Sequence, residues 1–454
     1  MAKYQKYAEY KDSGVEWLGA IPGHWGVTQL KRLGKFITGM TPSTAVEAYY
    51  SDEITEYGWI RPEDILEESE KVEPTKFLTK LGWETQRTIP AQSTLICCIG
   101  TIGKLGFLGK RAVTNQQITA LVPNVRGFSK YYYYLLTASR NQLEHLATGN
   151  VVKILNSERL GSLWLPLLSS QNEARQIVHF LDHETAKIDS LIAKQEKLIE
   201  LLKEKRQAVI SHAVTKGLNP DVAMKNSAVE WLGQVPEHWT IPQIGYHAEV
   251  TKLTGFEYTN LWMPTEEGEI IALRGFNIQE RYLDLNKTER ISTNLSNKLF
   301  RSKLFKGDLV LPCTGTLGNA ALIENDDTFH INQNIAKVTF DKNLFVPEFC
   351  LYWVTSQPFR QMIDFNNTSG MQPVLLIGDI RKLPIPLCSR VEQIEIVNYL
   401  DHQTQRMGEL IRKAESAIQL MQERRTALIS SAVTGKIDVR NWQHPNEAKM
   451  EFSA

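Results

Sequence analysis

The sequence predicts an α+β protein in which one unit, a mixed α/β domain followed by a long helix, occurs twice. The first observation behind this prediction is an internal repeat that covers most of the chain. The second is a change inside each copy, from alternating strand-like segments to a stretch poor in Gly and Pro. At 454 residues the chain is also too long for one hydrophobic core.

The repeat is defined by short segments that recur in the same order. EWLGAIPGHW at 16–25 returns as EWLGQVPEHW at 230–239, which is an offset of 214 residues. The offset grows to 219 residues toward the end of each copy, which indicates one duplicated unit with small insertions. The other paired segments are 100–103 with 315–318, 115–118 with 332–335, 181–183 with 400–402, and 213–215 with 432–434.

The first part of each copy predicts a mixed α/β domain. The run at 93–99 is apolar, alternating and bounded by Gly and Pro, which is typical of a strand. The turn at 306–308 leads into the equivalent strand of the second copy. Four consecutive tyrosines at 131–134 suggest base stacking, but a buried or half-buried helix face is the favoured interpretation.

The last part of each copy predicts a long helix, from about Thr185 to Thr215 in the first copy and on the order of 45 Å long. Heptad spacing of apolar residues with charged neighbours predicts a coiled coil. The first helix leads into the second domain and the second helix leaves that domain, so the pair must be antiparallel. The predicted seam residues are Ile188, Leu191, Leu198, Leu202 and Val209, with Met407, Leu410, Ala417, Met421 and Leu428 in the second helix.

This connectivity predicts a pseudo-two-fold, near-circular arrangement. Residues 16–19 should dock near the end of the second helix, and residues 230–233 near the end of the first. The predicted boundaries are 1–165 and 219–385 for the two domains, 166–218 and 386–440 for the two helical regions, and 441–454 for a C-terminal tail.

Composition narrows the class of function. The balance of 51 basic and 51 acidic residues argues against a free-standing DNA-binding protein with a uniformly basic surface. Any phosphate contacts must then be local or supplied by a partner. The segment from Glu47 to Glu73 is strongly acidic and should face away from phosphate. The chain shows no signal peptide and no apolar run of about 20 residues, so we expect a cytoplasmic protein with no membrane contact and reduced cysteines.

Catalytic motifs are missing from the sequence. There is no Asn-Pro-Pro-aromatic tetrapeptide, no dinucleotide-binding glycine motif and no phosphate-binding loop, which argues against a self-sufficient methyltransferase or nuclease. His179 and His183 have metal-ligand spacing, but the second copy has Asn398 and His402, which argues against a metal site.

Several segments resemble type I restriction-modification specificity subunits. The opening YKDSGVEWLG at 10–19 with IPGHW at 21–25 is similar to the start of many of them, and so is the segment at 386–397 with its Glu-Gln pair. The first copy departs there, because LLSSQNE at 167–173 lacks the usual second Pro and the Glu-Gln pair. The resemblance covers essentially the whole chain, and the order of domain, helix, domain and helix is more specific than any single motif.

The resemblance implies a non-catalytic subunit that binds double-stranded DNA. Each domain would read one half of an asymmetric bipartite site, and the helices would set the spacer between the halves. Two modification subunits would methylate adenine N6 with S-adenosylmethionine, and restriction subunits, where present, would use ATP and Mg²⁺; this chain itself would hold no cofactor. The alternative is a two-ended scaffold between protein partners that does not touch DNA.

Base reading in the major groove favours Arg, Lys, Asn and Gln on exposed loops. Alternatively, the Asn and Gln clusters satisfy backbone groups between strands. The candidate DNA-binding residues are Arg61, Lys104, Asn115, Gln116, Gln117 and Lys153 in the first copy, and Arg274, Asn319, Asn332, Gln333, Asn334 and Gln372 in the second.

Overall fold

The computed structural model describes residues 4–66, 70–326, 328–366 and 374–445, and it forms two compact units. Unit 1 comprises Met1–Gln195 and Ser416–Ala454, and unit 2 comprises Glu196–Glu415. Unit 1 is therefore built from both ends of the chain. Each unit also contains one part of each long helix, α5 (Gln171–Lys216) and α11 (Arg390–Val433).

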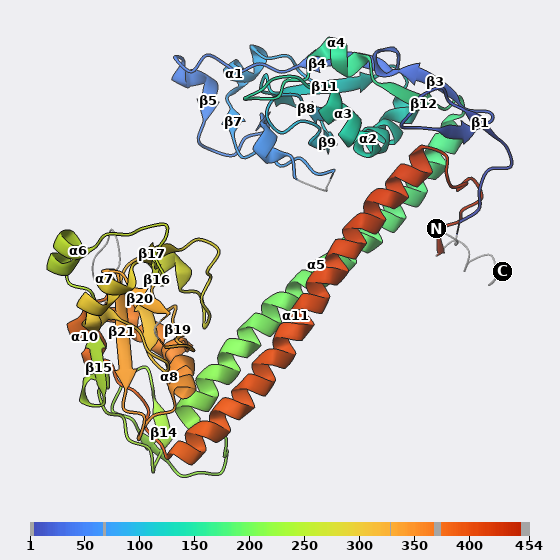
Figure 1. Ribbon diagram of the computed structural model, residues 1–454. Helices are drawn as coiled ribbons and strands as arrows, with labels where there is room; N and C mark the ends of the chain where they lie inside the picture. The colour runs from blue at the N-terminus through green and yellow to red at the C-terminus, as the bar shows by residue number, and fades with distance from the viewer. Residues whose placement is uncertain (1–3, 67–69, 327, 367–373, 446–454) are drawn as a thin grey trace. The chain divides into compact units, whose positions relative to one another are not determined.

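The centre of unit 1 is a four-stranded antiparallel sheet in the order β4–β11–β8–β9 (Figure 1). Side chains of β8 alternate between two cores: Ile96 packs with helix α2 and the long helices, whereas Leu95 and Cys97 pack into a second core. The strand predicted at 93–99 is thus confirmed. The sheet strands are β4 (Gly34–Thr38), β11 (Ile118–Pro123), β8 (Thr94–Cys97) and β9 (Leu105–Phe107).

Short elements surround this sheet. Its neighbours include two-stranded pairs, among them the parallel pair of β6 and β10. These elements are β1 (Tyr10–Asp12), β2 (Ala20–Pro22), β3 (Gly26–Gln29), β5 (Tyr50–Ser51), β6 (Trp59–Ile60), β7 (Phe77–Leu78), α1 (Lys80–Glu84), β10 (Val113–Thr114), α2 (Ser129–Ala138), α3 (Arg140–Leu146), α4 (Ser157–Gly161) and β12 (Trp164–Leu167).

Unit 2 repeats this topology. Its sheet has the order β15–β21–β18–β19, all antiparallel, and β16 pairs with β20 in parallel, as β6 does with β10. The sequence repeat is therefore a repeat of one fold. The elements are β13 (Met224–Asn226), β14 (Gln234–Pro236), β15 (Ala248–Thr251), α6 (Gly255–Leu261), β16 (Ile270–Leu273), β17 (Glu289–Ile291), α7 (Thr293–Lys298), β18 (Leu309–Pro312), β19 (Ala321–Leu322), β20 (Phe329–Ile331), β21 (Ile335–Phe340), α8 (Pro347–Val354), α9 (Gln357–Asn366) and α10 (Ile377–Lys382).

The four tyrosines of α2 are core residues. Tyr131 to Tyr134 are each at most 6% exposed. The Tyr131 hydroxyl donates to Val433 O of α11 over 3.1 Å, and the Tyr134 hydroxyl donates to Asp182 of α5 over 2.6 Å. Burial raises the pKa of Tyr132 and Tyr133 to about 12. The buried-face interpretation is confirmed and the base-stacking one is wrong.

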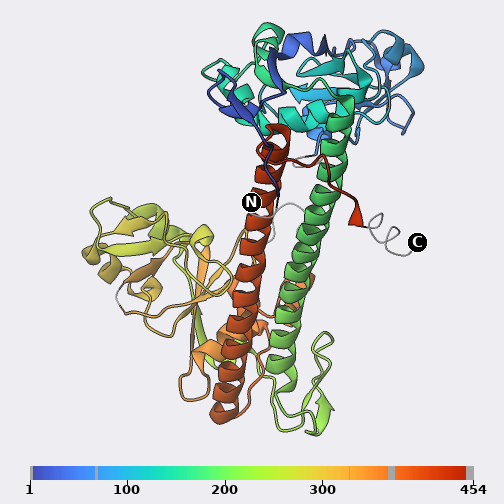
Figure 2. The ribbon, with the colours of Figure 1, turned by 90° about the vertical axis from the view of Figure 1, so that its right-hand side faces the viewer.

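In each unit the α5 and α11 segments lie side by side and run in opposite directions (Figure 2). In unit 1, Ile188 of α5 shares a core with Leu428 of α11, and Arg425 Nε lies 2.8 Å from Asp189 Oδ1. In unit 2, Ile210 shares a core with Leu400. The antiparallel pairing is confirmed, although α5 begins at Gln171, earlier than the predicted Thr185.

Seven of the ten predicted seam residues are buried or half-buried. Ile188, Met407 and Leu428 are buried, and Leu202, Val209, Ala417 and Met421 are half-buried. The other three predicted residues, Leu191, Leu198 and Leu410, are wrong, because they are 42%, 44% and 43% exposed.

Their C-terminal neighbours take the seam positions instead: Ile192 and Ile199 are half-buried, and Ile411 is 8% exposed. In each of these Leu-Ile pairs the sequence allows either residue to occupy the seam, because residues three and four positions after a seam residue lie on nearly the same helix face. Packing against the antiparallel partner segment selects the step of four.

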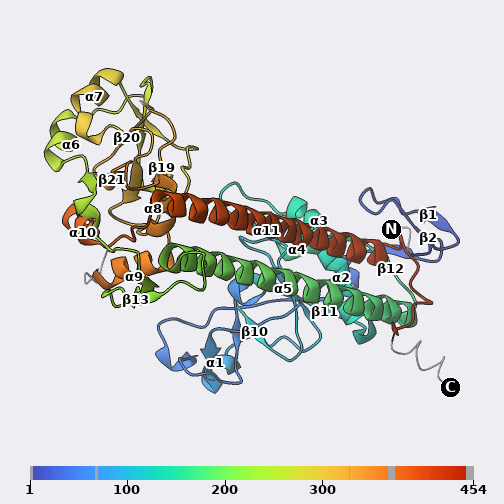
Figure 3. The ribbon, with the colours of Figure 1, turned by 90° about the horizontal axis from the view of Figure 1, so that it is seen from below.

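The repeated segments dock where they were predicted to dock. In unit 1, β1 and β2 lie beside the end of α11 (Figure 3), and Lys436 Nζ donates to Leu18 O over 2.8 Å and to Ala20 O over 2.6 Å. In unit 2, Leu232 and Val235 share a core with Val214 near the end of α5. Each repeated segment therefore covers the end of the helix that precedes it in the near-circular order.

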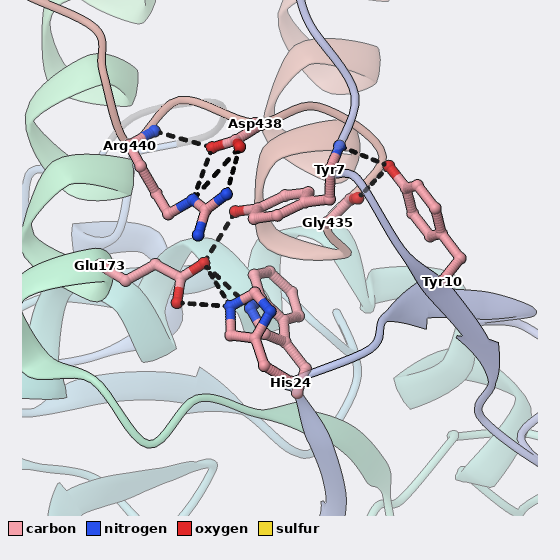
Figure 4. A network of polar contacts seen from close by, with 8 residues as sticks. Tyr7, Tyr10, His24, Glu173, Gly435, Asp438 and Arg440 are labelled. Atoms are coloured by element: carbon pink, nitrogen blue, oxygen red, sulfur yellow. Dashed lines mark hydrogen bonds and ion pairs between the residues drawn. The ribbon is translucent and has the colours of Figure 1, made fainter.

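A carboxylate in the first turn of each long helix holds the repeated segment of the same unit, and Figure 4 shows the buried Glu173 of unit 1. Glu173 of α5 accepts hydrogen bonds from Trp25 Nε1 at 3.0 Å and from the Tyr7 hydroxyl at 2.9 Å, and its Oε2 lies 3.0 Å from His24 Nε2. Burial and this carboxylate raise the pKa of Tyr7, so its hydroxyl stays a donor.

Unit 2 uses the same arrangement. Glu392 of α11 accepts from Trp239 Nε1 at 3.0 Å and lies 2.9 Å from His238 Nε2. The His-Trp pair that ends the repeated segment is thus the part that holds the helix start.

The seam assignment is testable with adjacent residues. Ile411→Ala should cost about 2–4 kcal/mol of unfolding free energy, because it opens a cavity, whereas Leu410→Ala should cost less than about 1 kcal/mol at an exposed position. Urea unfolding followed by circular dichroism measures both. Equal shifts of the midpoint for the two variants would contradict the assignment.

The carboxylate anchor is testable at Glu173. Glu173→Ala leaves Trp25 Nε1 and the Tyr7 hydroxyl buried without an acceptor, so we expect a loss of about 2–3 kcal/mol and faster amide exchange in residues 5–25. Thermal unfolding and hydrogen–deuterium exchange measure these effects. Glu16→Ala, at an exposed carboxylate of the same segment, is the control and should leave both unchanged.

Candidate nucleic-acid interface

The candidate residues of the first copy gather where β8 ends. Cys98 N donates to Gln117 O over 2.8 Å, and Cys98 O accepts from Leu155 N over 2.8 Å. Gly100 N donates to Lys153 O over 3.1 Å. Residues 98–100 therefore lie between the 115–117 turn and the 148–155 segment, which brings the Asn-Gln-Gln cluster and Lys153 to one end of the sheet.

The glycine turn after β8 carries Lys104. Gly100 and Gly103 have φ of +78° and +76°, a backbone conformation that side chains disfavour. Cys97 N donates to Lys104 O over 2.9 Å, which returns the chain to β9 and leaves the Lys104 side chain half-exposed. Gly315 and Gly318 repeat the turn at +81° and +84°, followed by the half-exposed Asn319.

The structure separates reading candidates from framework residues within the 115–117 turn. Asn115 is buried: its Nδ2 donates to Gln117 Oε1 over 2.9 Å and its Oδ1 accepts from Gln117 N over 3.1 Å. Gln116 is exposed and its Oε1 accepts from the Thr41 hydroxyl, while Gln117 is half-exposed. The expectation of an exposed loop residue is therefore wrong for Asn115, which satisfies backbone groups as the alternative interpretation holds.

Arg61 is close in space but engaged by its own neighbours. Asn115 N donates to Ile60 O over 3.0 Å, so Arg61 lies beside the turn. Its guanidinium pairs with Glu63 at 2.8 Å and donates to the Thr75 hydroxyl over 2.9 Å. Lys153 differs, because its side chain is exposed in the loop that follows α3.

The second copy reproduces the same frame. Asn332 is 5% exposed and its N–H donates to Leu273 O over 3.2 Å, so it is a framework residue like Asn115, contrary to expectation. Cys313 N donates to Asn334 O over 2.7 Å. Gln333 is half-exposed and Asn334 exposed.

The remaining candidates of the second copy have different surroundings. The Asn319 Nδ2 donates to Ile278 O over 3.1 Å, so this side chain is partly committed to the fold. Arg274 is exposed and pairs with Glu289 at 3.5 Å. Gln372 lies outside the described residues.

Two arginines absent from the predicted set lie against the glycine turns. A Cβ atom added at Gly103 would lie 3.0 Å from Arg140 Cγ, and one added at Gly318 would lie 3.0 Å from Arg360 Cγ. Both arginines are half-exposed. Arg140 begins α3, which follows α2, and Arg360 lies in the first turn of α9, which follows α8. Their separation of 220 residues is close to the repeat offset, which is the sequence signal that identifies them.

The described residues were also searched for membrane-spanning helices and for metal sites. Among the described residues, no helix combines the length and apolarity needed to cross a membrane. In the same part of the chain, no group of three or more His, Cys, Asp or Glu side chains could hold a metal ion. His179 and His183 instead pack against the Trp442 ring, with centroids 5.3 Å away in each case.

The chain is similar in sequence to type I restriction enzyme specificity subunits. The model of the type I restriction modification DNA specificity domain matches residues 22–201. The EcoBI specificity subunit of Escherichia coli is 22% identical over 403 residues, covering 88% of this chain and 78% of that protein. The MjaVIII specificity subunit of Methanocaldococcus jannaschii is 21% identical, covering 93% of this chain and 95% of the relative.

Solved structures share the fold. A chain from a structure on complex assembly and conformational transition of the type I R-M system aligns with a TM-score of 0.69 at 13% identity, covering 91% of this chain and 98% of that one. The HsdS subunit from Thermoanaerobacter tengcongensis aligns with a TM-score of 0.50 at 13% identity, covering 92% and 98%. The two-domain, two-helix fold is thus shared with these chains.

The division into framework and exposed residues is testable by stability. Asn115→Ala should cost about 1–2 kcal/mol, because the Gln117 N–H and amide lose their buried partner. Gln116→Ala, one residue along on an exposed side chain, should stay within about 0.5 kcal/mol of the wild type. Thermal unfolding measures the pair, and a Gln116 variant as unstable as the Asn115 variant would refute the division.

Proposed function

We propose that this chain is a type I restriction-modification specificity subunit and reads an asymmetric bipartite DNA sequence, as its similarity to such subunits supports. Each of its two domains would bind one half of the site in the major groove of double-stranded DNA. The chain would act without catalytic chemistry of its own.

The observation that carries the proposal is that the two domains share the same backbone structure at the sheet end but differ in the side chains that this end exposes. The turn after β10 and the turn after β20 are held by the same backbone bonds, and each begins with a buried asparagine, Asn115 or Asn332. The third residue of the turn differs between the copies: it is the half-exposed Gln117 in one and the exposed Asn334 in the other.

The neighbouring glycine turns differ in the same way, since Lys104 stands where the second copy has Asn319. Side chains of this kind recognise base edges by paired hydrogen bonds, and a changed set recognises a different base pattern. Two copies of one frame with two sets of side chains suit two different half-sites.

Charge supports a shared rather than a solitary DNA-binding surface. The chain has no net charge, and Arg61 and Arg274 are paired with carboxylates. Lys104 and Lys153 supply local positive charge beside the 115–117 turn, whereas Arg140 lies 3.9 Å from the Glu144 carboxylate. Phosphate contacts over a whole site need more cations than these, so we expect partner subunits to supply the remainder.

The expected partners are two modification subunits that methylate adenine N6 with S-adenosylmethionine, and restriction subunits with ATP and Mg²⁺ where the system has them. Under this proposal the cofactors are bound by those partners. The present chain selects the sequence at which they act.

A methylome tests the proposed function. The chain is expressed with its modification subunit in a host without DNA methylation, and N6-methyladenine is mapped across the genome. We expect one bipartite motif with a fixed spacer, and replacing residues 26–160 with those of another specificity subunit should change one half of it. Gln116→Ala should weaken methylation through that half, and Asn334→Ala should weaken it through the other half.

The alternatives predict different maps. A uniform loss at all sites in the Gln116 variant would mean that this residue does not read bases. A stable complex of the subunits that yields no motif would favour the scaffold function instead.

A further inference from the structure

An apolar loop tip projects from the first domain beside the candidate reading residues. Val151 is 97% exposed, and Val152 and Ile154 are 49% and 47% exposed. Three exposed aliphatic residues within four positions form a small apolar surface that the described residues of this chain leave uncovered. Isolated exposed apolar residues are common, but a cluster at a loop tip is typical of a contact surface.

The loop is held in one shape. Thr148 and Ile154 exchange two backbone hydrogen bonds, at 2.9 and 2.7 Å, which close the loop at its base. Gly149 has φ +125°, and a Cβ atom there would lie 2.1 Å from Val152 O, so glycine is required. Valine side chains are stiff at χ1, so the tip presents its methyl groups with little conformational freedom to lose.

The tip is continuous with the proposed reading surface. Gly100 N donates to Lys153 O over 3.1 Å, and Leu155 N donates to Cys98 O, which in turn lies beside Gln117. The exposed Lys153 follows the two valines directly. An apolar tip is therefore flanked by a cation suited to phosphate and by polar side chains suited to base edges.

The major groove offers one apolar group, the C5-methyl of thymine, and aliphatic side chains recognise it by contact. We propose that Val151 and Val152 contact thymine C5-methyl groups in the major groove of the half-site that the first domain reads. This inference rests on the proposed function and adds a residue pair and a base to it. The polar candidates would then account for hydrogen bonding, and the valines for recognition of thymine.

The test replaces thymine by uracil, which lacks only the methyl group. The chain is purified with its modification subunits, and affinity is measured for duplexes that carry the methylome-derived site with each dT of the first domain's half-site replaced in turn by dU. Under the proposed function each half-site contains an A·T pair, because adenine is the methylated base. We expect a loss of about fourfold for each buried methyl group at one or two positions.

Protein variants assign that loss to the loop. In Val151→Ala and Val152→Ala the ratio of affinities for dT and dU should fall toward one at the same position. Ile54→Ala removes another β-branched residue, 87% exposed in the acidic segment of the same domain, and should keep the wild-type ratio. dU substitutions in the half-site of the second domain should give the same ratio in all four proteins.

The outcomes separate this inference from the proposed function. Specific binding with no dU-sensitive position would overturn the methyl contact and leave sequence reading intact. A dU effect that persists unchanged in both valine variants would also overturn it. Equal weakening of all DNA sequences by Val151→Ala would point to a nonspecific contact instead, and absence of specific binding would overturn both proposals.

Discussion

The first turn of each long helix carries a carboxylate that accepts hydrogen bonds from the repeated segment of the same unit. The packing within each unit depends on this contact. Glu173 and Glu392 occupy the first turn of α5 and α11, where a negative charge is favourable to the helix dipole. Burial of the Glu173 carboxylate is costly unless donors compensate for lost water, and the indole N–H of Trp25 does so. The partly exposed Glu392 accepts from the Trp239 indole N–H in the same way. The same indoles pack in the cores that contain the end of the other helix. One short segment thus joins the start of one helix to the end of the other.

The sheet of each unit holds a turn whose side chains differ between the two copies. In both units the strand order is the same, and the turn at the sheet end begins with a buried asparagine, Asn115 or Asn332. Because the backbone bonds of the turn do not involve the exposed side chains, those residues can change without disturbing the fold. The side chains of Gln117 and Asn319 each make one hydrogen bond within the fold, and the other copy has Asn334 or Lys104 at the equivalent position.

The distribution of charge fits a subunit that works in a complex. Some arginines pair with carboxylates of the same unit, as Arg61 does with Glu63 and Arg425 of α11 does with Asp189 of α5, so their charge is already paired within the fold. The exposed surface at the sheet end combines amides, a few cations and the apolar tip at Val151. Such a surface suits discrimination between bases more than strong attraction to phosphate.

The sequence by itself determined the duplication, the strand at 93–99, the antiparallel helices and the docking of the repeated segments, because these follow from repeat order, periodicity and connectivity. It could not choose between Leu410 and Ile411 for the seam, since adjacent apolar residues fit one helical stripe equally well and only packing against the partner segment decides. Nor could it separate Asn115 from Gln116, or detect Arg140 and Val151 at the same sheet end. Burial of a side chain, and its proximity to residues distant in the chain, depend on how the tertiary structure brings loops together. Local sequence patterns do not indicate either.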